Sequence, residues 1–186
     1  LGFIDDGSPH QGRRIHSPRV PVPEAAPSLH LDEVKVMHFV GVDLRRWRSK
    51  IRWYQAWEWL NNRTRRPIQL YRFYHKDLFV PRDATHPVPQ AWIAGYEARG
   101  IDVFANEGEK VHRWDVATLQ LMIRHGPETF RHLAIWDVDW TALNNTVNPG
   151  RGHVEVRDPR TPFERLVQWW LRKTQPYYSH HGRPNS

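Results

Sequence analysis

The clearest pattern of hydrophobic and polar positions lies between residues 33 and 60. Over residues 34–40, apolar side chains fall on both faces of an extended chain, which predicts a strand buried on both sides, as in a parallel or mixed sheet. Asp43 is then a favourable N-cap, and apolar residues recur every three or four positions from Leu44 to Leu60. We therefore predict a buried strand, a short turn and a long amphipathic helix.

The same kind of pattern predicts the other elements. We expect helices over residues 68–78, 89–99, 114–125 and 161–173, and short strands over residues 101–104 and 133–140. Together these elements predict an α/β fold of mixed α+β character, in which several amphipathic helices pack on a short mixed sheet.

Composition narrows the classes of protein that fit. The chain has 186 residues, which is the size of one domain, and it has no cysteine, so disulfides, thiolate metal sites and cysteine nucleophiles are excluded. No apolar run approaches about 18 residues, so we expect no transmembrane segment and a cytoplasmic location. Because the chain begins with Leu1, we expect a processed protein or a fragment.

The formal net charge of +7 favours an anionic partner, such as a nucleic acid, a phosphorylated small molecule or an acidic membrane surface. Arg45, Arg48 and Arg52 form one stripe of the helix that begins at residue 44, and Arg46 and Lys50 lie beside it. Cations near the positive end of a helix dipole cost up to about 1 kcal/mol each, which a bound anion would offset. The alternative is a solvated basic face without a ligand.

Three further places carry candidate chemistry, each with an alternative. His38 lies near the C-terminal end of the predicted strand, where α/β proteins bind ligands, but it can equally be a hydrogen-bonded core residue. Asp137 and Asp139 share one face of a predicted strand and could bind a divalent cation, or else cap a helix or pair with arginines. His10 and Arg13 flank Gly12 in a cluster that suits an anion or a solvated loop.

Three motifs, taken in order, carry a resemblance to a known family. They are His10-Gln11-Gly12-Arg13, the segment Val36-Met37-His38-Phe39 followed by Lys50, and the segment Leu70-Tyr71-Arg72-Phe73-Tyr74-His75. Over residues 8–78 the chain resembles the C-terminal part of bacterial family 2 glycosyltransferases.

That resemblance implies a nucleotide-binding α/β fold and transfer of a sugar from a nucleotide diphosphate donor to a saccharide or another hydroxyl acceptor. It implies Mn²⁺ or Mg²⁺ as cofactor, with His38 as a metal ligand. Arg46 and Lys50 would neutralise the diphosphate leaving group, and His10 and Arg13 would line the donor or acceptor cleft.

The chain departs from the family pattern because the nucleotide-binding strands and the D-x-D motif normally precede this region. We therefore expect a C-terminal fragment that is inactive alone. We divide it into the end of a catalytic domain over residues 1–80, a helical or α+β extension over residues 81–176 and a frayed tail over residues 177–186. The preferred alternative is a nucleic-acid-binding module that uses Arg45, Arg48, Arg52 and exposed aromatic residues. A third is an interaction domain whose aromatic residues all lie in the core.

Overall fold

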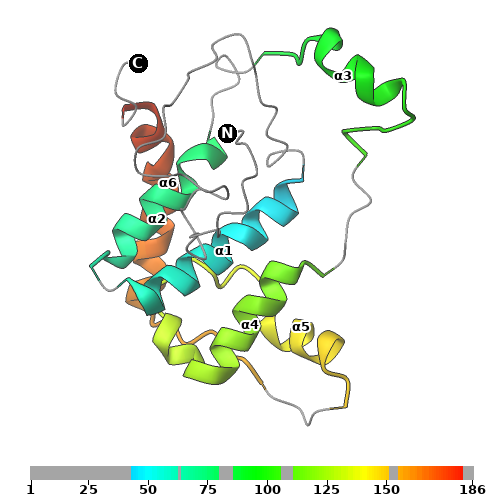
Figure 1. The fold of residues 1–186 in the computed structure, drawn as a ribbon. Helices are drawn as coiled ribbons and strands as arrows, with labels where there is room; N and C mark the ends of the chain where they lie inside the picture. The colour runs from blue at the N-terminus through cyan, green and yellow to red at the C-terminus, as the bar shows by residue number, and fades with distance from the viewer. Residues whose placement is uncertain (1–42, 63, 80–85, 106–110, 151–154, 182–186) are drawn as a thin grey trace, which may run out of the picture. The chain divides into compact units, whose positions relative to one another are not determined.

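The computed structural model describes residues 43–62, 64–79, 86–105, 111–150 and 155–181, and the regular secondary structure within these ranges is helical (Figure 1). The elements are α1 (Leu44–Asn61), α2 (Pro67–His75), η2 (Lys76–Phe79), α3 (Gln90–Glu97), α4 (Arg113–His125), η4 (Pro127–Phe130), α5 (Trp140–Val147) and α6 (Pro162–His181), where η marks a 3₁₀ helix. No strand occurs within these ranges. The predicted α/β fold with a mixed sheet is therefore wrong for the described part of the chain, and the predicted strand over residues 34–40 lies outside it.

The segment 133–140 shows why a strand-like pattern does not form a strand here. The indole N–H groups of Trp136 and Trp140 donate to the carbonyl oxygens of Phe130 (3.1 Å) and Ile135 (3.0 Å), so side chains occupy acceptors that a sheet would use. Asp139 accepts from the backbone N–H of Ala142 at 2.9 Å and caps α5, which begins at the next residue. The alternating apolar pattern therefore reflects a buried loop that leads into a helix.

The second predicted strand, over residues 101–104, is also wrong. Residues 103 and 104 form a turn, in which the backbone N–H of Phe104 donates to Asp102 Oδ1 at 2.8 Å. Aspartate side chains favour turns because they can replace a backbone acceptor in this way. The apolar residues Ile101 and Phe104 remain about half exposed, at 48% and 50%.

The helix predictions are confirmed at their starts. Asp43 caps α1 by accepting from the backbone N–H groups of Arg45 (2.9 Å) and Arg46 (3.0 Å). Thr161 caps α6 in a reciprocal capping box with Glu164, whose carboxylate accepts from the Thr161 backbone N–H at 2.7 Å. These contacts follow from the sequence alone, because a capping residue acts within three or four positions of itself.

Helix α6 continues to His181, past the expected end near Lys173. Contacts with α2 hold the additional turns in place. Gln175 accepts from Arg72 Nη1 at 2.9 Å and donates to the Arg72 carbonyl oxygen at 3.3 Å, and Arg72 also donates to the carbonyl oxygen of Leu171. Tertiary contacts of this kind cannot be read from local propensity.

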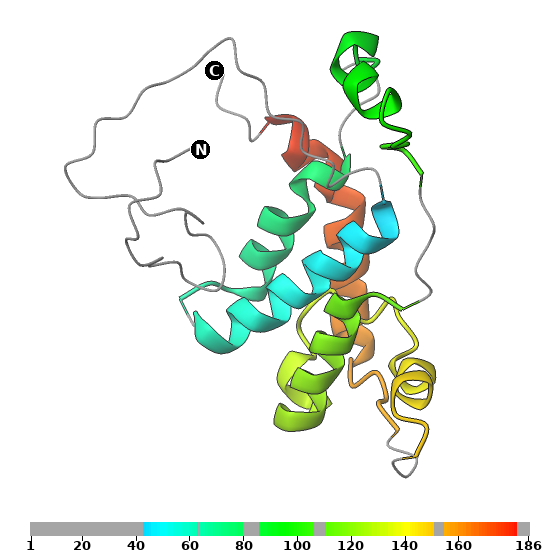
Figure 2. The same ribbon diagram turned by 45° about the vertical axis from the view of Figure 1, so that its right-hand side comes forward.

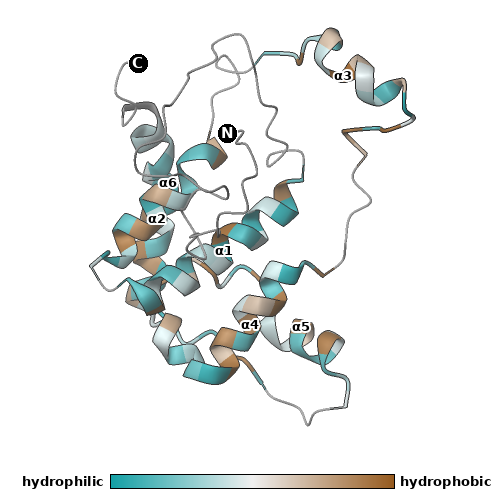
Figure 3. Cartoon of the chain, in the orientation of Figure 1, coloured by the Kyte–Doolittle hydropathy of each residue, from teal (hydrophilic) through white to brown (hydrophobic). Residues whose placement is uncertain are grey.

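The core lies where α1 packs against both α2 and α4, and α2 packs in addition against α6 (Figures 1 and 2). Hydrophobic and hydrophilic patches lie side by side on α1, α2 and α4, as expected of helices with one buried face (Figure 3). The buried cluster consists of Ile51, Ala56, Leu70, Tyr74, Leu119, Met122, Phe130, Leu133, Ile135, Trp136, Trp140 and Val156. It draws on α1, α2, α4, η4 and α5, and this shared core positions the cavity described next.

Candidate anion-binding site

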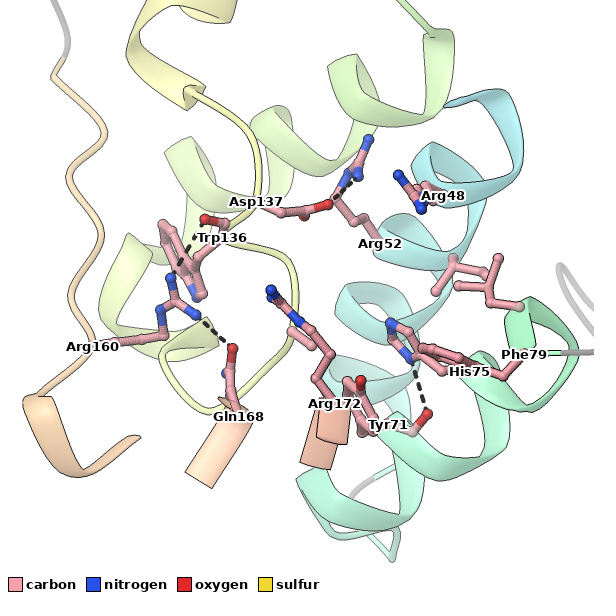
Figure 4. A pocket seen from close by; sticks show the side chains of 13 residues that line it. Arg48, Arg52, Tyr71, His75, Phe79, Trp136, Asp137, Arg160, Gln168 and Arg172 are labelled. Atoms are coloured by element: carbon pink, nitrogen blue, oxygen red, sulfur yellow. Dashed lines mark hydrogen bonds and ion pairs between the residues drawn. The ribbon is translucent and has the colours of Figure 1, made fainter. Parts of the chain in front are cut away.

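A cavity of about 410 Å³ opens between α1, α2, η2, the loop 134–137 and α6 (Figure 4). Four arginines contribute to its wall: Arg48, Arg52, Arg160 and Arg172. Among the described residues that line it, Asp137 is the one acidic residue and His75 is the one histidine. The chemistry of the cavity therefore depends on which arginines already have carboxylate partners.

Arg52 is buried and is neutralised by carboxylates. Its Nε and Nη2 atoms donate to the two oxygens of Asp115 at 2.8 and 2.9 Å, and its Nη1 donates to Asp137 at 3.0 Å. Asp115 is as deeply buried as the arginine, while the side chain of Asp137 is 47% exposed. This planar, two-oxygen pairing is the geometry in which arginine binds carboxylates most strongly, so Arg52 is committed to holding α1 against α4.

Arg160 is committed in the same manner. It donates through Nε (2.9 Å) and Nη2 (2.7 Å) to the carboxylate of Asp158, and through Nη1 to Gln168 Oε1 at 2.6 Å. Gln168 in turn donates to the carbonyl oxygen of Leu133 at 2.6 Å, which ties this wall of the cavity to the core. We therefore assign Arg160 a positioning role.

Arg48 and Arg172 differ from the other two arginines. Both are solvent-exposed, and within the described residues neither forms an ion pair with a carboxylate. Arg48 comes from α1 and Arg172 from α6, and both contribute to the cavity wall together with His75 (Figure 4). Two uncompensated guanidinium groups on separate helices therefore lie at one cavity.

His75 is held as a neutral imidazole between these cations. Its ring stacks on Tyr71 with centroids 4.0 Å apart, and its Nδ1 lies 2.9 Å from the Tyr71 carbonyl oxygen. Burial lowers the pKa of His75 to about 4, and the nearby charges of Arg172 and Arg48 act in the same direction, against the opposing effects of the Tyr71 carbonyl and Asp137. At neutral pH the imidazole therefore carries no charge.

Of the described residues, those that the resemblance assigned to the site do not line this cavity, whereas Arg48, Arg52 and Asp137, which the sequence pattern named as candidates, do. His10, Arg13 and His38 lie outside the described residues. Arg46 is exposed, and Lys50 places its Nζ 5.4 Å from the centre of the Tyr54 ring; neither is part of the cavity wall.

Helix geometry explains that difference. Arg46 and Lys50 are each offset by two positions from Arg48, and two residues correspond to a rotation of about 200° around a helix. The stripe that contains Arg48 and Arg52 therefore faces the cavity. Arg46 and Lys50, to which the glycosyltransferase resemblance assigned a role, do not line it.

Sequence reasoning assigned no role to Tyr71, His75, Arg160 or Arg172, although two of them belong to the third motif of the resemblance. The sequence did indicate that one pair lies together, because Tyr71 and His75 are four residues apart and therefore share a helix face. Arg160 and Arg172 lie more than 80 residues away in the sequence, so that only the tertiary fold brings them to the cavity.

The described residues do not fit the Mn²⁺ or Mg²⁺ that the resemblance implies. Asp137 pairs with Arg52, and Asp139 caps α5, so the two carboxylates serve different contacts. Within the described ranges no cluster of three or more His, Asp or Glu side chains is placed to hold a metal ion. The predicted metal ligand, His38, lies outside those ranges.

Comparison with models of protein families, with curated proteins and with solved structures finds no significant match. Among the described helices, none is both long and apolar enough to cross a membrane.

Proposed function

We propose that the chain binds a phosphate-bearing small molecule in the cavity between α1, α2 and α6. One observation carries the proposal: Arg48 and Arg172 reach the same cavity from different helices and have no carboxylate partner within the described residues. Arginine donates in a planar fork that matches phosphate oxygens, and its weak hydration makes it the preferred cation for such contacts.

The charge balance of the wall supports an anion. The four arginines of the wall outnumber the carboxylates that pair with Arg52 and Arg160, which are Asp115, Asp137 and Asp158. A net positive charge therefore remains at Arg48 and Arg172. His75 adds no further positive charge because it is neutral. A bound phosphate would supply the missing negative charge in a partly desolvated site, where such contacts are stronger than in water.

The size of the cavity supports a molecule larger than a free ion. Its volume of about 410 Å³ lies in the range of sites for small organic ligands, which is about 300–1,000 Å³. The walls also include the aromatic rings of Tyr71, Phe79 and Trp136. We therefore propose a phosphate ester and not inorganic phosphate as the natural ligand.

The resemblance to glycosyltransferases supports a narrower proposal, which is that the ligand is a nucleotide diphosphate sugar and that the whole protein transfers the sugar to a hydroxyl acceptor. In that case Arg48 and Arg172 are better placed than Arg46 and Lys50 to neutralise the diphosphate, because they line the cavity. The chain has no cysteine, which is compatible with a reducing compartment, and we propose the cytoplasm as its location.

Titration calorimetry with UDP tests the proposal. We expect Arg48→Ala and Arg172→Ala each to weaken UDP binding by about tenfold or more, as for loss of a charge-assisted hydrogen bond. Arg46→Ala and Lys50→Ala are matched controls that remove a cation from α1 outside the cavity, and they should leave the affinity within about twofold. UDP binding that is insensitive to Arg48 and Arg172 would contradict the proposal, and no UDP binding by the folded chain would contradict its narrower form, the nucleotide diphosphate sugar.

The nucleic-acid alternative has less support in the described residues. It requires the stripe of Arg45, Arg48 and Arg52 to face a phosphate backbone, yet Arg52 is buried between two carboxylates. A module of that kind would show affinity for single-stranded oligonucleotides that falls steeply with salt and that depends on Arg45 as much as on Arg48.

A further inference from the structure

The hydrogen bond between His75 and Tyr71 determines which tautomer the imidazole adopts. A carbonyl oxygen only accepts, so the His75 Nδ1 that lies 2.9 Å from it must carry the proton. The imidazole is neutral, and its Nε2 therefore holds an unshared electron pair. In Figure 4 the ring nitrogen that is not bonded to Tyr71 points into the cavity, toward the space between Arg48 and Arg172.

A neutral acceptor between two guanidinium groups has a consequence for the ligand. Phosphate oxygens bound by the arginines are themselves acceptors when the phosphate is fully ionised, so they can pair with His75 Nε2 only if the imidazole takes up a proton, which its low pKa opposes. Water can donate to this nitrogen until the ligand displaces it. A ligand that has no donor at this position then leaves a buried acceptor unpaired, which costs more than a typical hydrogen bond contributes.

We infer that the ligand carries a hydroxyl donor close to its phosphate, and that the hydroxyl donates to Nε2 of His75 while Arg48 and Arg172 hold the phosphate. This inference rests on the proposed function, because it requires the phosphate to bind at these two arginines. It adds a property of the ligand, which is a free hydroxyl group near the phosphate, and it assigns His75 as the residue that selects for it.

Two further features of the site support a hydroxylated ligand. The side chain of Asp137 is 47% exposed and lies in the wall, so it offers a second acceptor beyond the oxygen that Arg52 uses. The stacked contact with Tyr71 fixes the plane of the imidazole, and thereby the direction of the Nε2 lone pair. A site that is built to pair with a donor group rejects an analogue without it more strongly than an apolar pocket could.

Glycerol 3-phosphate and n-propyl phosphate form a matched pair of probes, because they share the phosphate ester and the three-carbon chain and differ in two hydroxyl groups. By titration calorimetry at pH 7.5, we expect the wild-type chain to bind glycerol 3-phosphate about tenfold more tightly than n-propyl phosphate. His75→Phe keeps a planar ring against Tyr71 but removes the acceptor. This variant should lose most of the preference for glycerol 3-phosphate, and it should bind n-propyl phosphate at least as tightly as the wild type does, because no acceptor is left unpaired.

Nitrogen-15 NMR of the imidazole gives a readout that does not depend on a variant. In the free protein we expect the Nδ1–H tautomer of His75 with its Nε2 bonded to water. The Nε2 resonance should stay that of a hydrogen-bonded acceptor with glycerol 3-phosphate and move to that of an unbonded acceptor with n-propyl phosphate. Equal affinities for the two probes in the wild type would overturn the inference and leave the proposed function standing. A preference that is undiminished in His75→Phe would remove His75 from this role. Failure of both probes and of UDP to bind would overturn the proposed function itself.

Discussion

Arg52 is the residue on which the arrangement of the site depends most. It spans from α1 to Asp115 on α4 and to Asp137 in the loop that forms one wall of the cavity. We expect Arg52→Ala to lower the free energy of unfolding by about 3–5 kcal/mol, because it leaves Asp115 buried without a counter-charge. Arg52→Lys should lose less, since one ammonium group can pair with Asp115 but cannot reproduce the two-oxygen fork.

Urea unfolding followed by circular dichroism measures both changes. Arg45→Ala is the matched control, because Arg45 is exposed on the same helix and its backbone N–H, not its side chain, contacts Asp43. That control should stay within about 0.5 kcal/mol of the wild type. An Arg52→Ala variant as stable as the control would show that the buried ion pair contributes nothing to the stability of the fold.

At the scale of single elements, the residues that start and stop helices act locally. Gly126 ends α4 with φ = 79°, a conformation that residues with a side chain rarely adopt. We expect Gly126→Ala to destabilise the chain by about 1 kcal/mol, through backbone strain alone, since an added Cβ would meet no atom within 4 Å.

Gly150→Ala is the control for this change, because its Cβ would also meet open space while its φ is not positive. We expect the midpoint of urea unfolding to stay unchanged or to rise slightly for Gly150→Ala and to fall for Gly126→Ala. Equal midpoints for the two variants would show that the conformation of Gly126 carries no strain for alanine.

The start of α6 depends on a capping box that also reaches another element. Thr161 and Glu164 bond to each other's backbone N–H groups, and Glu164 pairs with Arg131 at 2.8 Å. We expect Thr161→Ala to lower the free energy of unfolding by about 1 kcal/mol, since it exposes an unpaired helix N–H. Thr146→Ala on α5 is a control, because the Thr146 hydroxyl donates to a carbonyl within its own helix. A Thr161→Ala variant no less stable than this control would contradict a capping role.

These helix ends were predictable from the sequence because capping and stopping residues act over a few positions. The strands over residues 101–104 and 133–140 were predicted wrongly for the opposite reason. An alternating pattern records only which side chains are buried, and at residues 133–140 the burial comes from indole groups that donate to loop carbonyls. Periodicity over four to eight residues cannot distinguish that loop from a strand.

At the scale of the whole molecule, the site was only partly predictable. The basic character of α1 and the stripe that contains Arg48 could be identified from spacing alone. Arg160 and Arg172 could not, because more than 80 residues separate them from α2 and only the tertiary fold brings them to the cavity. A family resemblance cannot supply such residues when its motifs end before them, as this one does at residue 78.

The pH dependence of global stability gives a test of His75 that needs no ligand. A pKa of about 4 in the folded chain, against 6.5 in the unfolded chain, means that the folded state resists protonation of His75 while the unfolded state accepts it. The contribution of neutral His75 to the free energy of unfolding is therefore fully present above pH 6.5, and it is lost as the pH falls from 6.5 to 4. Linkage sets its full size at about 3 kcal/mol.

His75→Phe should flatten this part of the curve, so that the stability of the wild type relative to the variant falls by about 3 kcal/mol between pH 7 and pH 4. The charges that face His75 come from α1 (Arg48), α6 (Arg172) and the loop before α5 (Asp137), and all three remain in the variant. Glu164 affects stability over a different pH range. Its hydrogen bond with Arg131 is the main reason that its pKa is lowered to about 2, so the stability that it contributes is lost only below pH 4.5. Parallel stability curves for the wild type and His75→Phe between pH 7 and pH 4 would show that His75 titrates alike in both states, and the neutral acceptor that faces Arg48 and Arg172 would then no longer be supported.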